Sequence, residues 1–141
     1  MNQEKLDVVY MKMAMAFAEL SYCKRSQVGA IVVKDGNIIA CGFNGTPSGF
    51  ENCCEEKNED KTKPEVLHAE SNCIAKIAKS TQSSLDAHLY VTMLPCLDCA
   101  KLIIQAGIKK VFYKDDYRNK DGLLLLDKVN ISVINLSAYF Q

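Results

Sequence analysis

Apolar residues along the chain follow two different spacings, and these spacings predict the order of helices and strands. Near the start they recur every three or four residues, as at Leu6, Tyr10 and Met13, which is the pattern of an amphipathic helix. Elsewhere they form short runs rich in β-branched residues, which is the pattern of strands. The predicted elements are a helix over about 4–21, strands over 28–34 and 38–43, a helix over about 68–79, a strand over 88–93, a helix over 96–105, a strand over 111–113, a helix over 123–128 and a strand over 131–136.

This order of elements predicts the fold class. The pair Asp35-Gly36 between the first two strands is a strong turn signal and predicts a hairpin. After the hairpin, helices separate the remaining strands, which favours a mixed sheet with helices on both faces. We therefore expect an α/β fold with three layers, α/β/α, around a five-stranded mixed sheet, in a single domain over residues 1–141.

The segment from Asn44 to Glu65 shows neither spacing. It includes a mixed charge run from Glu55 to Lys63, which is typical of a solvated surface. We expect this segment to be a loop between the second strand and the second helix.

The charge balance excludes some classes of partner. Lysine and arginine number 17, and so do aspartate and glutamate, so no basic face for nucleic acid is evident. Apolar runs are short and broken by charges, which argues against a membrane span. The first residues include an acid and no long apolar stretch, unlike a secretory signal. We expect a cytoplasmic protein, or one in the host cytoplasm if its source is viral.

The chain has seven cysteines, an odd number, and two of them form a Cys-x-x-Cys pair. Without a secretory signal, this pattern favours a reducing compartment. We therefore expect metal-bound and buried thiols instead of a disulfide framework.

Two short motifs suggest the chemistry, His68-Ala69-Glu70 and Pro95-Cys96-Leu97-Asp98-Cys99. One neutral imidazole and two thiolates fill three of the four tetrahedral positions of Zn²⁺ and leave the fourth for water. Each motif lies at the start of a predicted helix, where the positive end of the dipole favours thiolates. Glu70 is close enough in sequence to His68 to handle protons of that water without binding the metal. The open position indicates a catalytic site.

The order His-x-Glu followed by Pro-Cys-x-x-Cys is an established signature of zinc deaminases that act on nucleobases. On these residues the chain resembles the cytidine deaminase superfamily. Within it, three further stretches resemble the deoxycytidylate (dCMP) deaminase branch: Ser26–Ala30, Gly42–Pro47 and Cys99–Lys109.

The resemblance implies roles for the two motifs. His68, Cys96 and Cys99 would bind one catalytic Zn²⁺ per chain. Glu70 would carry protons from the attacking water to ring N3 and then to the leaving amine. The reaction would be hydrolytic deamination of dCMP to dUMP, which supplies thymidylate synthesis.

The resemblance also implies substrate contacts. Asn44 would contact the sugar, and Tyr117 and Arg118 would line the pocket near the 5′ side of the nucleotide. A monophosphate site also needs fixed positive charge and hydrogen-bond donors. The further candidates for phosphate contact are Lys24, Arg25 and Ser26.

Regulation and assembly are further implications of the resemblance. Many members are activated by dCTP and inhibited by dTTP bound around the Gly42–Pro47 loop, and Mg²⁺ would accompany a nucleoside triphosphate effector. Members are typically hexamers. The candidate effector residues here are Gly42, Asn44 and Gly45.

Several candidates also have a purely structural interpretation. Asn44-Gly45 can be a simple turn, and Lys24-Arg25 can be a charge pair at a helix C-terminus. Tyr117 and Arg118 lie in a charged stretch that can be a solvated loop. A closed, structural zinc site would not need Glu70.

Cys23, Cys53 and Cys54 are a separate case. Some members carry a second zinc in this region, but their sites use histidines from a longer insert. This chain has only His68 and His88, so no fourth ligand is obvious and buried or free thiols are favoured.

Alternative functions come from two classes. A free cytidine deaminase is disfavoured, because such enzymes usually have a cysteine in place of His68. A tRNA adenosine deaminase is disfavoured as well, because it should carry a basic face and the net charge of this chain is zero. An enzyme that acts on guanine is a further alternative. A bifunctional dCMP/dCTP deaminase is harder to separate, because one loop can extend the phosphate pocket. A deaminase fold acting only as a binding module would have no need of Glu70. A small nucleotide is therefore the expected partner.

Overall fold

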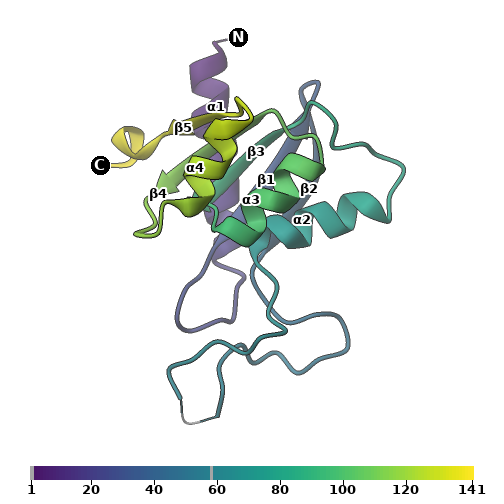
Figure 1. Ribbon diagram of the computed structural model, residues 1–141, viewed down its shortest axis with the longest axis vertical. Coiled ribbons are helices and arrows are strands. Elements are labelled where there is room, and N and C mark those ends of the chain that lie inside the picture. The colour runs from purple at the N-terminus through teal and green to yellow at the C-terminus, as the bar shows by residue number, and fades with distance from the viewer. Residues whose placement is uncertain (1, 58) are drawn as a thin grey trace.

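The computed structural model describes residues 2–57 and 59–141 (Figure 1). The predicted order of helices and strands is confirmed, and a short C-terminal 3-10 helix, η1, adds to it. The elements are α1 (Gln3–Ala18), β1 (Gly29–Lys34), β2 (Asn37–Phe43), α2 (Ala69–Ala78), β3 (His88–Met93), α3 (Leu97–Gln105), β4 (Lys110–Asp115), α4 (Asp121–Lys128), β5 (Ser132–Asn135) and η1 (Ser137–Phe140).

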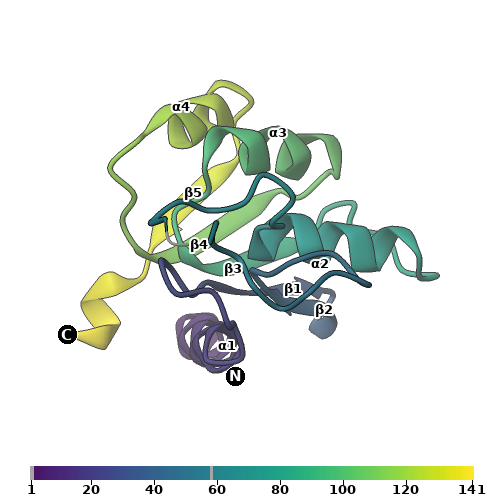
Figure 2. The same cartoon turned by 90° about the horizontal axis from the view of Figure 1, so that it is seen from below.

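The five strands form one mixed sheet in the order β2-β1-β3-β4-β5. β1 pairs antiparallel with β2 and with β3, whereas β3, β4 and β5 pair in parallel. Helix α1 covers one face of the sheet, and α2, α3 and α4 cover the other (Figures 1 and 2). The expected three-layer α/β/α fold with a five-stranded mixed sheet is confirmed.

The hairpin forms where the Asp35-Gly36 pair predicts it. Lys34 pairs with Asn37, so the turn has two central residues, and their φ angles are 50° at Asp35 and 77° at Gly36. Positive φ at both positions is the requirement of a type I′ turn, which glycine meets without steric cost.

The central strands bury apolar side chains on both faces of the sheet. Their sequences are nearly continuous apolar runs without alternating polar residues, which is typical of strands covered on both sides. Along β3, Leu89 and Val91 pack against the α2–α4 layer, whereas Tyr90 packs on the α1 side and stacks on Phe112 with ring centroids 4.4 Å apart. This two-sided core fixes α2 and α3 on one face of the sheet, so that the same end of both helices can form a site.

The segment between β2 and α2 is a loop, as expected, with two isolated β-bridges among its described residues. It is not simply solvated, however. Cys54 forms a disulfide with Cys23, with Cα atoms 5.2 Å apart, and both cysteines are buried. The prediction of buried or free thiols is therefore wrong at this pair in that the two sulfurs are bonded to each other, although both residues are buried. The two residues lie 31 positions apart, and only the folding back of the loop brings them together.

The possible second zinc at Cys23, Cys53 and Cys54 is also contradicted. Two of its three sulfurs are bonded to each other. Among the described residues, one group of histidine, cysteine or acidic side chains lies close enough together to hold a metal ion, and this group contains none of these three cysteines. No helix in the described ranges combines the length and apolar character needed to cross a bilayer.

Candidate active site

The starts of α2 and α3 bring the two predicted motifs into one cluster. His68 is the N-cap of α2, Cys96 is the N-cap of α3, and Cys99 lies in the first turn of α3. The Nδ1 atom of His68 is 3.4 Å from Sγ of Cys96 and 3.3 Å from Sγ of Cys99. The side chains thus converge from two helix N-termini, where the dipoles favour thiolates.

This set of donors fits a zinc ion. Zn–S bonds of about 2.3 Å and a Zn–N bond of about 2.0–2.1 Å give N···S separations of about 3.6 Å between tetrahedral ligands. The observed separations are close to this value. His68, Cys96 and Cys99 are the whole of the cluster found among the described residues, so their geometry matches an open, three-ligand site.

The two thiols of the cluster differ in acidity. A hydrogen bond from Cys99 lowers the pKa of Cys96 to about 4, helped by a hydrogen bond with His68. The same bond to Cys96, together with burial, raises the pKa of Cys99. Metal ligation requires both sulfurs as thiolates, so binding of a divalent cation would release any proton that Cys99 carries.

Glu70 lies in the first turn of α2, two residues after His68, and is 4% exposed. Burial raises the pKa of its carboxyl group to about 7. A carboxyl group that titrates near neutral pH can both accept and donate a proton, which is what a proton shuttle requires.

A pocket of about 290 Å³ opens over the cluster. Glu70, His68 and Cys96 line it together with an apolar wall, formed by Val28, Val66, Met93 and Leu94. Its volume lies at the lower end of the range for small-molecule sites. The arrangement can therefore hold one small, partly polar ligand above the metal-binding group.

Five of the six predicted substrate residues line this pocket, namely Arg25, Ser26, Asn44, Tyr117 and Arg118. Lys24 is exposed and is not among the lining residues. The Arg25 side chain is held at the rim, because Nη1 donates to Oγ1 of Thr62 at 3.2 Å and Nε lies 3.3 Å from the carboxylate of Asp60.

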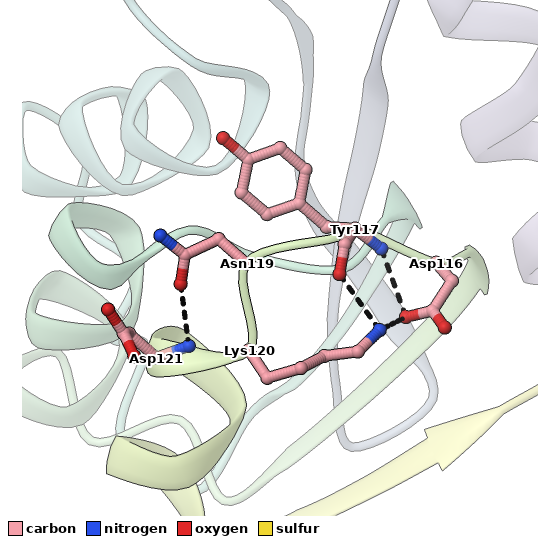
Figure 3. Close-up of polar contacts among 5 residues, drawn as sticks. All are labelled: Asp116, Tyr117, Asn119, Lys120 and Asp121. Carbon is pink, nitrogen blue, oxygen red and sulfur yellow. Dashed lines mark hydrogen bonds and ion pairs between the residues drawn. The ribbon is translucent and has the colours of Figure 1, made fainter.

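Tyr117 lies in a hydrogen-bonded loop that precedes α4 (Figure 3), and Arg118 is the next residue of this loop. Nζ of Lys120 donates to the Asp116 carboxylate and, at 2.8 Å, to the carbonyl oxygen of Tyr117. The Tyr117 ring projects away from this ammonium group, as Figure 3 shows. Tyr117 and Arg118 thus line the pocket from an internally hydrogen-bonded loop, whereas Asp115, Asp116 and Asp121 of the same charged stretch are exposed to solvent.

The start of α4 is fixed against the metal-binding turn. A Cβ atom at Gly122 would lie 2.3 Å from the carbonyl oxygen of Pro95. Only glycine allows this close approach of the two backbones. The first turn of α4, which follows the loop that carries Tyr117, is therefore packed directly against the residue before Cys96.

Asn44 lines the pocket but also fixes a backbone segment. Its Oδ1 accepts from the N–H of Val28 at 2.9 Å, and its Nδ2 donates to the carbonyl of Ser26 at 2.8 Å. The side-chain amide has a second N–H and a second lone pair, so a contact with a ligand remains chemically available.

The two glycines of the predicted effector loop have packing reasons for their identity. A Cβ atom at Gly45 would lie 2.8 Å from the hydroxyl oxygen of Tyr22, and one at Gly42 would lie 3.3 Å from Sγ of Cys73. Gly45 also pairs with Leu67 across an isolated bridge. A side chain at Gly45 would thus force Tyr22 to move, whereas Gly42 is only tightly packed against Cys73.

Sequence reasoning missed Glu55 and Thr62, which line the pocket from the long loop. Both residues lie in the charge run that was predicted to be solvated. No local sequence pattern indicates that a side chain in such a run contacts a backbone segment far away in the sequence. One oxygen of Glu55 accepts from the backbone N–H groups of Lys24 and Arg25, at 2.9 and 3.2 Å.

Comparisons with known proteins agree with this geometry. The family described as "Cytidine and deoxycytidylate deaminase zinc-binding region" matches residues 4–115. The structure is similar to that of dCMP deaminase from the cyanophage S-TIM5 in complex with dCMP and dUMP, with a TM-score of 0.91, 49% identity, and coverage of 94% of this chain and 97% of the other.

Curated relatives point the same way. The deoxycytidylate deaminase of Enterobacteria phage T4 is 32% identical over 168 residues, which covers 89% of this chain and 87% of the relative. ComE operon protein 2 of Bacillus subtilis (strain 168) is 40% identical over 111 residues, or 77% of this chain, and the chain spans only 59% of that relative. On the family match and these identities, the chain belongs to the cytidine and deoxycytidylate deaminase family.

Proposed function

We propose that this protein is a zinc-dependent enzyme that hydrolyses dCMP to dUMP and ammonia. The observation that carries the proposal is the open cluster of His68, Cys96 and Cys99 beside the buried Glu70, in a pocket that is also lined by arginine. The solved complex of the cyanophage enzyme with dCMP and dUMP supports this substrate class.

Glu70 would move the protons of the reaction. A zinc ion held by the cluster supplies Lewis acidity, which makes hydroxide available from water at neutral pH. Glu70 accepts the proton of the attacking water and passes it to ring N3 of cytosine. It then takes the remaining proton from the hydroxyl group formed at C4 and delivers it to the amine, which leaves as ammonia while C4 keeps the oxygen as a carbonyl. A pKa of about 7 suits Glu70 to both directions of transfer.

The polar wall of the pocket would bind the nucleotide. Asn44 would contact the sugar through the donor that its backbone contacts leave available. Arg25 and Arg118 would face the 5′-phosphate, with Ser26 and Tyr117 as hydroxyl donors. Lys24 would contribute long-range positive charge, since its side chain is outside the lining.

Regulation and assembly are further proposals that rest on the family. We propose one deaminase domain over residues 1–141, a hexamer, and regulation by dCTP and dTTP at Gly42, Asn44 and Gly45 with Mg²⁺ on the effector. Initial rates with each triphosphate, with and without Mg²⁺, test the regulation. Light scattering of the purified protein tests the assembly.

A substrate panel tests the proposed specificity. We expect kcat/KM for dCMP to exceed that for deoxycytidine by at least about tenfold, because the phosphate-binding groups lose their partner in the nucleoside. Arg25→Ala and Arg118→Ala should raise KM for dCMP and leave deoxycytidine nearly unchanged, with Lys128→Ala as a distant control. Preference for deoxycytidine would contradict the nucleotide assignment, and equal turnover of dCTP would identify a bifunctional enzyme.

A further inference from the structure

Glu55 connects two segments that are far apart in the sequence. Its Oε2 atom accepts from the N–H groups of Lys24 and Arg25, residues 31 and 30 positions earlier. Consecutive backbone N–H groups that point at one oxygen form a small anion-binding concavity. In this structure the carboxylate of the protein itself fills that concavity.

The neighbouring residues reinforce this contact. Cys54 precedes Glu55 and is bonded to Cys23, which precedes Lys24. The long loop is therefore fastened to residues 23–25 by one covalent bond and two charge-assisted hydrogen bonds. We call residues 23–25 and 54–55 the clasp.

The clasp determines where Arg25 lies. The backbone N–H of Arg25 is held by Glu55, and its side chain is held by Thr62 and Asp60 of the same loop. Arg25, Ser26 and Glu55 all line the pocket. A loose clasp would leave the guanidinium group free to swing out of the pocket, because its exposed ion pair with Asp60 is weak.

The charge of Glu55 makes its position informative. A carboxylate in a pocket for an anionic substrate repels that substrate. Its two hydrogen bonds to backbone N–H groups offset this repulsion, and they fix the backbone at Lys24 and Arg25 instead of binding the ligand. An acceptor oxygen without the negative charge would serve as well.

We propose that Glu55 is a positioning residue, which holds the backbone of Lys24 and Arg25 so that the Arg25 side chain meets the 5′-phosphate of the substrate. This inference rests on the proposed function, since it uses Arg25 as a phosphate contact. Glu55 acts through Arg25 and takes no part in proton transfer.

The test compares Glu55→Ala, Glu55→Gln and the control Glu51→Ala, an exposed glutamate of the same loop. In Glu55→Ala, KM for dCMP should rise about tenfold, which corresponds to the usual free-energy contribution of a hydrogen bond. The value of kcat and the rate with deoxycytidine should stay within about twofold of wild type. Glu55→Gln keeps the acceptor oxygen and should restore KM to the wild-type value or below. Glu51→Ala should match wild type.

Hydrogen exchange gives a readout that does not depend on activity. The N–H groups of Lys24 and Arg25 should lose protection in Glu55→Ala and keep it in Glu55→Gln. Unchanged KM for dCMP in Glu55→Ala, or equal damage from Gln and Ala, would overturn the proposal. Proportional loss with dCMP and deoxycytidine would overturn it too.

The Arg25→Ala variant distinguishes a failure of the positioning role of Glu55 from a failure of the proposed function. If Arg25→Ala leaves KM for dCMP unchanged, the phosphate assignment itself is wrong, and the inference falls with it. If Arg25→Ala raises KM and Glu55→Ala does not, the assignment stands and only the positioning role of Glu55 is overturned.

Discussion

Glu70 combines a titratable side chain, near-complete burial and a position in the first turn of α2. Glu70→Gln keeps the shape of the side chain and removes its ability to accept a proton. We expect turnover of dCMP to fall by about 10²–10⁴-fold, the usual contribution of positioned proton transfer. Zinc content and melting temperature should stay close to wild type. A variant that keeps more than about a tenth of the activity would assign the shuttle to another group.

His68 should decide metal content because it contributes one of only three donors in the cluster. We expect about one zinc per chain in the wild type and little zinc in His68→Ala, measured by mass spectrometry of the metal after purification without chelators. Cys53→Ser changes a half-buried thiol outside the cluster and should keep the zinc. Undiminished zinc in His68→Ala would contradict the ligand assignment.

At the scale of elements, the packing of α4 against the turn before α3 should contribute more to stability than the exposed face of α4. Gly122→Ala would place a Cβ atom 2.3 Å from the carbonyl oxygen of Pro95, so the two backbones must separate. We expect a loss of about 1–3 kcal/mol in the free energy of unfolding, measured in urea with zinc present. Leu124→Ala, at a side chain that is 57% exposed, should change it by less than about 0.5 kcal/mol. Equal effects would contradict the close approach.

The elements and the metal cluster could be predicted from the sequence because their signals are local. Spacing of apolar residues defines a helix or strand, and the motifs at His68 and Cys96 lie at predicted helix starts. The wall of the pocket could not be predicted in this way. The partners of Glu55 lie 30 and 31 residues away, and Lys120 organises the Tyr117 loop through a backbone carbonyl that no sequence pattern identifies.

At the scale of the whole molecule, the Cys23–Cys54 bond joins the long loop to the rest of the fold. A cross-link between residues 31 apart stabilises a protein by about 3–4 kcal/mol in the chain-entropy model. Cys54→Ser should therefore lose about that much free energy of unfolding under non-reducing conditions. Cys53→Ser, at the adjacent unpaired thiol, should lose far less.

Thiol counting checks the same bond directly. Denatured but unreduced wild-type protein should show five reactive thiols per chain, the number of cysteines outside the disulfide. Seven thiols, the full cysteine count, would show that the bond is absent from the purified protein.

Hydrolytic deamination requires that water replace the amine at C4 of dCMP, with Glu70 moving the protons. The most direct measurement is incubation of the zinc-loaded protein with dCMP in ¹⁸O-labelled water, followed by mass spectrometry of the nucleotide product. We predict dUMP that carries one ¹⁸O atom on the base, formed together with an equal amount of ammonia, and almost no product with Glu70→Gln. Absence of labelled dUMP from the wild type would contradict hydrolytic deamination of dCMP.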